Sequence, residues 1–221
     1  MKDVIRMFQE RMGEIDSYFQ FLETIATPQA KVILKDGTTY EVDFHLNQIL
    51  RANGFLLLYN LTESSISQAI EVIHNDILQK GVEYDALNRL VKKEIFNHVR
   101  KNVKVDDFIN DIQNIVVDIV KFHPQSREIF SGNVDAREIK NLSGKYGFSC
   151  ETDAQKTKNG EKLMVVKNHR NDLAHGFVSF QECGKNYTIE DMLQIKEEVI
   201  NYIKGILENI ENYLREEKYK K

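Results

Sequence analysis

The scarcity of proline is the feature of this sequence that most limits what it can fold into. Pro28 and Pro124 are the only prolines in 221 residues. Because proline breaks helices, a chain with so few of them can form long uninterrupted helices. Apolar residues also recur at spacings of three and four along most of the chain, which is the periodicity of an amphipathic helix. The sequence therefore predicts a mainly α-helical bundle.

The expected elements follow this periodicity. An Asp-Gly turn at Asp36-Gly37, between two short alternating stretches, predicts a small β-hairpin within Ala30–Phe44. A second short hairpin is expected within 177–187, around Cys183-Gly184, and the polar segment 151–160 is expected to be an exposed loop. The expected helices cover 3–25, 45–79 (with a break possible near Gly54 or Asn60), 84–101, 105–122, 135–146, 163–175 and a last helix capped by Thr188. We predict an N-terminal helix and hairpin extension over 1–44, a helical domain over 45–217 and a frayed tail over 218–221.

Composition and charge exclude several classes of protein. Hydrophobic residues make up 42% and charged residues 29%, which is ordinary for a globular protein. The net charge of −4 disfavours a protein that coats nucleic acid without regard to sequence, although it is compatible with a local basic cleft. No apolar run approaches the roughly 18 to 20 residues that span a membrane, and the N-terminus lacks the apolar core of a signal peptide. We expect a cytoplasmic protein that does not enter a membrane.

The sequence predicts no metal site and no cofactor. Cys150 and Cys183 are the only cysteines, and they show no metal-ligand spacing. Free thiols are expected, with a disulfide between them left open. No Gly-rich phosphate loop and no Gly-x-Ser-x-Gly motif occurs. The histidines outside the segment 167–176 also lack ligand spacing: His45, His74, His98 and His123.

The segment Lys167–Gly176 carries the strongest chemical signal. Four residues separate Arg170 from His175, while Asn171 and His175 stand four positions apart and share one helix face. Gly176 predicts that the helix ends there, which places His175 in the last turn. The negative end of the helix dipole favours a protonated imidazole. An arginine with five donors beside a titratable histidine suits phosphoryl chemistry on RNA.

A purely structural explanation of this segment is also open. Arg170 would then form an ion pair with Asp172 or Glu161, and His175 would be only a polar residue at a helix end, since a motif this short often arises by chance. Asp172 either supports the histidine or caps and solvates the helix. His169, on another face, is expected at the surface or in an interface.

The wider context of the motif favours the functional interpretation. The run Arg-Asn-Asp-Leu-Ala-His-Gly from Arg170, together with the stretches Ser131–Ile139 and Tyr146–Phe148, resembles the HEPN superfamily, specifically its MAE_28990/MAE_18760-like group of toxin–antitoxin and phage-defence loci. The resemblance covers about residues 46–214. It implies a HEPN-type helical bundle and a composite ribonuclease site across a homodimer interface, with Arg170, Asn171 and His175 as its residues. It further suggests that Glu63, a polar residue in an otherwise apolar helix, faces the catalytic groove; a solvent-facing glutamate is the alternative.

Three hypotheses follow. The first is a metal-independent endoribonuclease, a toxin or defence effector, that acts as a homodimer on RNA and is paired with a cognate antitoxin or defence-system protein. The second is a catalytically silent HEPN module that binds or regulates a neighbouring protein. The third is a helical adaptor unrelated to HEPN, in which the motif is a coincidence.

Overall fold

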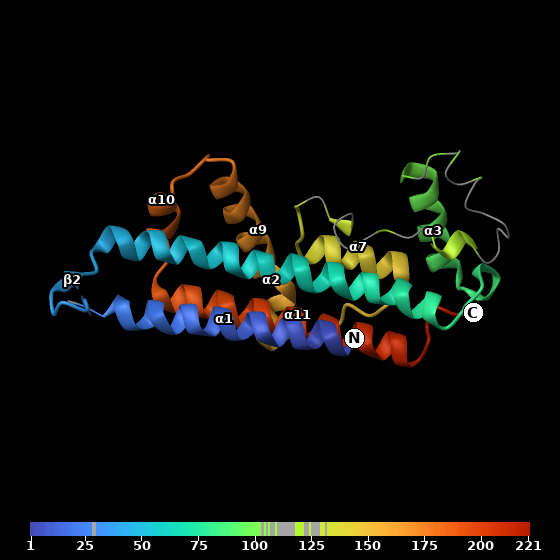
Figure 1. Cartoon of the computed structure of the whole chain (residues 1–221), viewed down its shortest axis with the longest axis horizontal. Coiled ribbons are helices and arrows are strands. Elements are labelled where there is room, and N and C mark those ends of the chain that lie inside the picture. Colours follow the sequence, from blue (N-terminus) through green and yellow to red (C-terminus); the bar gives the residue numbers. More distant parts are fainter. Residues whose placement is uncertain are drawn as a thin grey trace. The chain divides into compact units, whose positions relative to one another are not determined.

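The computed structural model of the chain is mainly α-helical, as predicted (Figure 1). It describes residues 1–27, 30–102, 104, 106, 109, 118–121, 124, 129–130 and 132–221. The α-helices are α1 (Lys2–Ala26), α2 (Phe44–Gln79), α3 (Arg89–Asn102), α7 (Ala136–Tyr146), α8 (Ala154–Thr157), α9 (Glu161–Ala174), α10 (Phe180–Gly184) and α11 (Ile189–Arg215). Short 3-10 helices span Tyr84–Ala86, Ile119–Lys121 and Lys158–Gly160. Among the helices of the described residues, none combines the length and apolar character needed to cross a membrane.

A two-stranded antiparallel hairpin joins α1 to α2, and it confirms the predicted turn (Figure 1). Its strands are β1 (Lys31–Ile33) and β2 (Thr39–Glu41). The backbone N–H and the hydroxyl of Thr38 both donate to Asp36 Oδ1, at 2.9 and 2.6 Å, and Gly37 adopts the positive φ of 82° that the turn requires. All six strand residues are exposed, so the hairpin buries little apolar surface of its own.

Two compact units make up the fold. The first, which we call the terminal unit, comprises Met1–Ile5, Glu63–Thr152 and Ile203–Lys221. The second, which we call the motif unit, comprises Arg6–Thr62 and Asp153–Tyr202. Helices α2 and α11 are long because neither contains a proline. Each of them contributes about one half to each unit.

The core of the motif unit is built from α1, the first half of α2 and the first half of α11. Gly54 permits a close approach here: a Cβ at this position would lie 2.8 Å from Met192 Cε and 3.2 Å from Phe19 Cζ. Lys196 bonds Asp16 at 2.7 Å, and its ammonium lies 5.4 Å from the centre of the Phe19 ring. The buried apolar side chains of this core include Phe8, Ile15, Phe19, Leu22, Ala52, Phe55, Leu58, Met192, Ile195 and Val199.

In the terminal unit, α7 begins and ends as its sequence predicts. The Asp135 carboxylate accepts hydrogen bonds from the backbone N–H groups of Arg137 and Glu138, which is an N-cap, and Gly147 ends the helix with φ 93°. The buried Tyr146 hydroxyl lies 2.8 Å from His74 Nε2. The Tyr146 carbonyl accepts a hydrogen bond from the Tyr213 hydroxyl at 2.7 Å.

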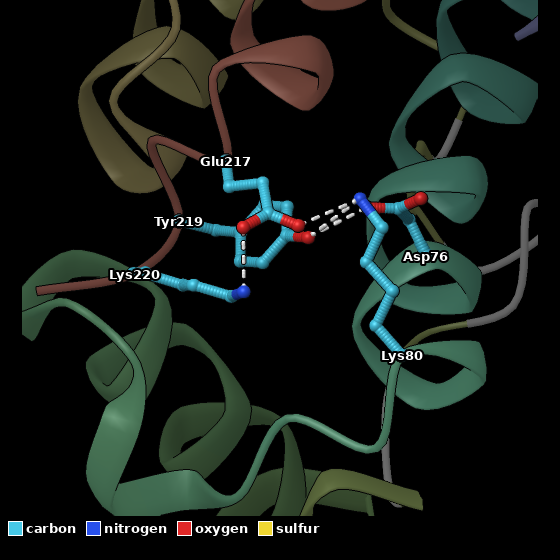
Figure 2. A network of polar contacts seen from close by, with 5 residues as sticks. All are labelled: Asp76, Lys80, Glu217, Tyr219 and Lys220. Atoms are coloured by element: carbon cyan, nitrogen blue, oxygen red, sulfur yellow. Dashed lines mark hydrogen bonds and ion pairs between the residues drawn. The ribbon is translucent and has the colours of Figure 1, made fainter.

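The C-terminal residues are packed rather than frayed, contrary to expectation. Tyr219 is fully buried, and its hydroxyl donates to Asp76 at 2.7 Å (Figure 2). Lys80 bridges Asp76 and Glu217 at 2.9 and 3.0 Å, and Lys220 bonds the same glutamate at 2.6 Å (Figure 2). The charged sequence of the tail gave no sign of this packing, in which the buried ring of Tyr219 is joined by ion pairs and by backbone hydrogen bonds to Asn88 and Ala86.

Several expected elements differ in the structure. The expected hairpin within 177–187 is wrong: Ser179 and Glu182 form a capping box that starts α10. The expected loop within 151–160 contains α8, capped by Asp153, and a 3-10 turn. Helix α3 begins at Arg89, later than the expected residue 84. Most of the expected helix over 105–122 lies outside the described residues.

Candidate active site

The predicted motif lies at the C-terminal end of α9, and the way this helix ends fixes its geometry. Its buried side is formed by Leu163, Val166 and Leu173. The backbone N–H of Gly176 donates to Leu173 O at 3.2 Å, and that of Phe177 donates to Asp172 O at 2.9 Å. With Gly176 at φ 70°, these two bonds form a Schellman motif, as the predicted glycine stop requires.

Arg170 is held by contacts on two sides. Its guanidinium carbon lies 4.4 Å from the centre of the Tyr59 ring, which is a cation–π distance. One of its terminal nitrogens, Nη1, donates to Asn171 Oδ1 at 2.9 Å. The arginine is only half-buried. The guanidinium is therefore oriented by Tyr59 of α2 and by its own neighbour Asn171.

His175 is the residue at which α9 ends, and it is exposed. Its backbone N–H donates to Asn171 O at 2.9 Å, which confirms that these two residues stand one helical turn apart. The imidazole ring pairs with the ring of Phe177, with 5.6 Å between centroids and 33° between planes. The predicted catalytic histidine is thus open to solvent at the end of the helix that carries Arg170.

His169, which the sequence placed at the surface or in an interface, is half-buried. Its Nε2 lies 2.6 Å from the Tyr187 hydroxyl, and its Nδ1 lies 3.5 Å from Cys183 Sγ. The Phe55 ring covers it at 4.6 Å between centroids. Burial lowers the pKa of His169 from its ordinary value of 6.5, an effect that the charge of Asp172 opposes. Both ring nitrogens are engaged inside the protein, so this histidine is poorly placed to exchange protons with a substrate.

The residues that follow α9 are bonded to α2 close to His169. Arg51 donates from Nη1 to the Tyr187 carbonyl oxygen, and Gln181 donates from Nε2 to His45 Nδ1 at 2.7 Å. Burial raises the pKa of the Cys183 thiol to about 11, and the charge of Asp172 contributes in the same direction. Cys183 is therefore a protonated thiol that packs, rather than a reactive thiolate. Cys150 and Cys183 are both free, as predicted.

The two secondary candidates lie in different surroundings. Asp172 is half-buried, its carbonyl helps to end α9, and its charge acts on His169 and Cys183. Glu63 is half-buried on α2 within the terminal unit, one helical turn after Tyr59. Its expected place in a catalytic groove remains a prediction.

Comparison with known families identifies the family of the chain. A model of the MAE_28990-like HEPN family matches residues 2–219. The chain belongs to this HEPN family. The match starts at residue 2, so the HEPN family pattern includes the N-terminal helix and hairpin, where the sequence resemblance was poor. No match was found among curated proteins or among solved structures.

The segment that carries Arg170, Asn171 and His175 has structural neighbours that the sequence did not indicate. Tyr59 lies one helical turn before Glu63, but the sequence indicated only Glu63 as a candidate on this helix. Tyr187 lies 17 residues after Arg170 and reaches His169 only through the fold. Over the described part of the chain, no three His, Cys, Asp or Glu side chains gather in a way that could hold a metal ion.

Proposed function

We propose that this HEPN protein is a metal-independent endoribonuclease that serves as a toxin or defence effector. One observation carries the proposal: an exposed histidine, His175, ends the same helix that carries Arg170, whose guanidinium is oriented by Tyr59 and Asn171. Membership of the HEPN family supports it, because ribonuclease activity is common in that superfamily.

The reaction uses the 2′-hydroxyl of the RNA as its nucleophile. A base removes the 2′ proton, and the 2′ oxygen forms a bond to the adjacent phosphorus. The bond from phosphorus to the 5′ oxygen breaks, and an acid protonates the departing oxygen. The products are a 2′,3′-cyclic phosphate and a 5′-hydroxyl, so no water is consumed in this step.

Each motif residue has a separate part in this reaction. His175 exchanges protons with the 2′ or the 5′ oxygen. Arg170 offers paired N–H donors to the phosphate oxygens, whose negative charge grows in the transition state. Asn171 positions that guanidinium, because its amide oxygen accepts a hydrogen bond from Arg170 Nη1 at 2.9 Å.

The proposed enzyme is a homodimer. Proton transfer on both sides of phosphorus needs two groups, and the neighbouring His169 has both nitrogens engaged. A two-fold axis near the end of α9 would bring two copies of His175 to one phosphate. RNA and a second copy of the chain are therefore the proposed partners, together with a cognate antitoxin or defence protein.

The deciding experiment incubates the purified protein with RNA in the presence of excess EDTA. Cleavage should persist, because the 2′ oxygen is the nucleophile and Arg170 supplies the positive charge. The products should carry a 2′,3′-cyclic phosphate, and DNA of the same sequence should survive. Products with a 5′-phosphate, or activity that chelation abolishes, would exclude this mechanism.

Variants separate chemistry from folding. His175→Ala should abolish cleavage and relieve growth arrest on expression while keeping the melting temperature, because the side chain is exposed. The matched control is Gln20→Ala, since Gln20 is an exposed polar residue on α1 in the same unit, and it should cleave normally. Arg170→Lys keeps the charge but loses the planar fork, so it should be severely impaired. A catalytically silent module would show no difference among these proteins.

Mixing variant chains tests whether the site is shared. If the arginine of one subunit serves the histidine of the other, a heterodimer of His175→Ala and Arg170→Ala chains keeps one complete pair and recovers part of the activity. Sedimentation of the wild-type protein at micromolar concentration should show a dimer. A strictly monomeric active enzyme would refute the composite site.

A further inference from the structure

Phe177 is the most exposed large apolar residue among those in the described part of the chain, with 79% of its surface accessible. It stands two residues after His175, and the two rings pair at 5.6 Å with only 33° between their planes. An aromatic ring left this open costs hydrophobic free energy, since burying it would stabilise the fold. Its position beside the proposed catalytic histidine therefore needs an explanation outside folding.

The ending of α9 does not supply that explanation. An apolar residue at the second position after a helix C-cap commonly packs against the residue three positions before that cap. In α9 these two positions are Phe177 and Asp172, joined by the backbone hydrogen bond of 2.9 Å. The partner position is thus an aspartate, and the ring stays exposed rather than covering it.

The backbone under Phe177 is nevertheless fixed. Its N–H is bonded to Asp172 O, and Gly176 before it holds the left-handed conformation at φ 70°. The ring is thus presented outward from an ordered helix end. An exposed aromatic face held at an ordered backbone position is what proteins use to stack unpaired nucleobases.

We propose that Phe177 is a stacking platform for the nucleobase next to the cleaved phosphate. This inference rests on the proposed ribonuclease function and narrows its substrate to single-stranded RNA. A base can stack on Phe177 only when it is unpaired and turned out of a helix, because paired bases in a duplex already stack on each other. Arg170 would hold the phosphate while Phe177 holds the adjoining base, and stacking would favour no particular base strongly.

The sequence offers a direct optical test, because the chain contains no tryptophan. Phe177→Trp introduces a single indole at the proposed platform, and Phe21→Trp places one on α1 at another exposed phenylalanine (46% accessible) as the matched control. Both are titrated with single-stranded RNA that carries 2′-O-methyl groups and cannot be cleaved. A stacked base should quench the emission of Phe177→Trp and leave Phe21→Trp unchanged. RNA duplex and base-free polyphosphate should quench neither.

Affinity gives a second readout. Phe177→Leu keeps an apolar side chain but no ring, so its dissociation constant for the same RNA should rise about 5- to 150-fold, while Phe177→Tyr should bind like the wild type. Absence of quenching, quenching by polyphosphate, or unchanged affinity of Phe177→Leu would overturn the platform. So would a blue shift of Phe177→Trp that grows with protein concentration without RNA, which would indicate a protein contact.

These results are distinct from a failure of the proposed function. If the wild-type protein cleaves RNA and Phe177→Trp is not quenched, the platform is wrong and the ribonuclease proposal stands. If quenching occurs and the wild-type protein leaves RNA intact, the base contact stands and the proposed catalysis is wrong.

Discussion

Replacing Gly184 by alanine should force apart two backbones of the motif unit. Gly184 is the last residue of α10, and a Cβ there would lie 1.8 Å from the Gln48 carbonyl oxygen and 2.7 Å from its carbonyl carbon on α2. Non-bonded carbon atoms pack best at about 3.5–4.0 Å, so the new Cβ and the Gln48 carbonyl carbon must separate by roughly 1 Å. The obstacle is backbone, so no side chain can rotate away to make room.

The expected loss of stability follows from this overlap. Overpacking of a well-packed site costs about 1–3 kcal/mol. For a chain of this size each kcal/mol lowers the melting temperature by about 2–4 °C, so Gly184→Ala should melt about 2–12 °C below the wild type. Thermal unfolding followed by circular dichroism measures this difference.

A glycine-to-alanine substitution at another position of the motif unit should raise the stability of the protein instead of lowering it. Gly13 lies within α1, and a Cβ there would meet no atom within 4 Å. Alanine is favoured over glycine inside a helix, so Gly13→Ala should stabilise the protein by about 0.5–1 kcal/mol. A Gly184→Ala protein as stable as the wild type or as Gly13→Ala would refute the close approach of α10 to α2.

Replacing Gly184 by alanine should also change the contacts of the candidate active site. Helix α10 carries Cys183, whose sulfur lies 3.5 Å from His169 Nδ1, directly beside the motif arginine. A displaced α10 should loosen this contact and slow RNA cleavage, whereas Gly13→Ala should cleave at the wild-type rate.

Three further predictions concern polar groups. Burial lowers the pKa of His169 in the folded state, so the unfolded chain binds this proton at a higher pH than the folded chain does. The stability that comes from the neutral His169 is therefore complete above about pH 6.5 and is lost as the pH falls below that value. Melting temperatures from about pH 8 to about pH 5 should fall less steeply for His169→Gln than for the wild type. Tyr219→Phe removes the 2.7 Å hydrogen bond to Asp76 and should cost about 1 kcal/mol in urea unfolding, and an unchanged midpoint would show that this bond does not anchor the tail. Cys183 should react slowly with thiol reagents near neutral pH and rapidly in denaturant, because burial raises its pKa to about 11; rapid modification of the folded protein would contradict that burial.

Local patterns account for most of the helices and for the ends of several. The caps at Asp135 and Thr188 and the stop at Gly176 are interactions between residues at most a few positions apart, so the sequence contains all the partners involved. The hairpin expected around Cys183 is wrong, although here too the deciding interaction is local. The capping box of Ser179 and Glu182 starts a helix, whereas the Cys-Gly pair had suggested a turn.

The sequence by itself determined the composition of the candidate site, because Arg170, Asn171 and His175 lie on one helix and helix geometry sets their spacing. Only the tertiary structure decided how those side chains are held and which remain accessible. The Tyr59 ring under the guanidinium and the Tyr187 and Cys183 groups around His169 come from other elements, brought there by burial of apolar faces. The sequence does not specify the partners in that burial, since periodicity shows which face of a helix is apolar but not which residues this face will contact. For this reason the exposure of His175 and Phe177 and the half-buried position of their neighbour His169 could be seen only in the folded chain.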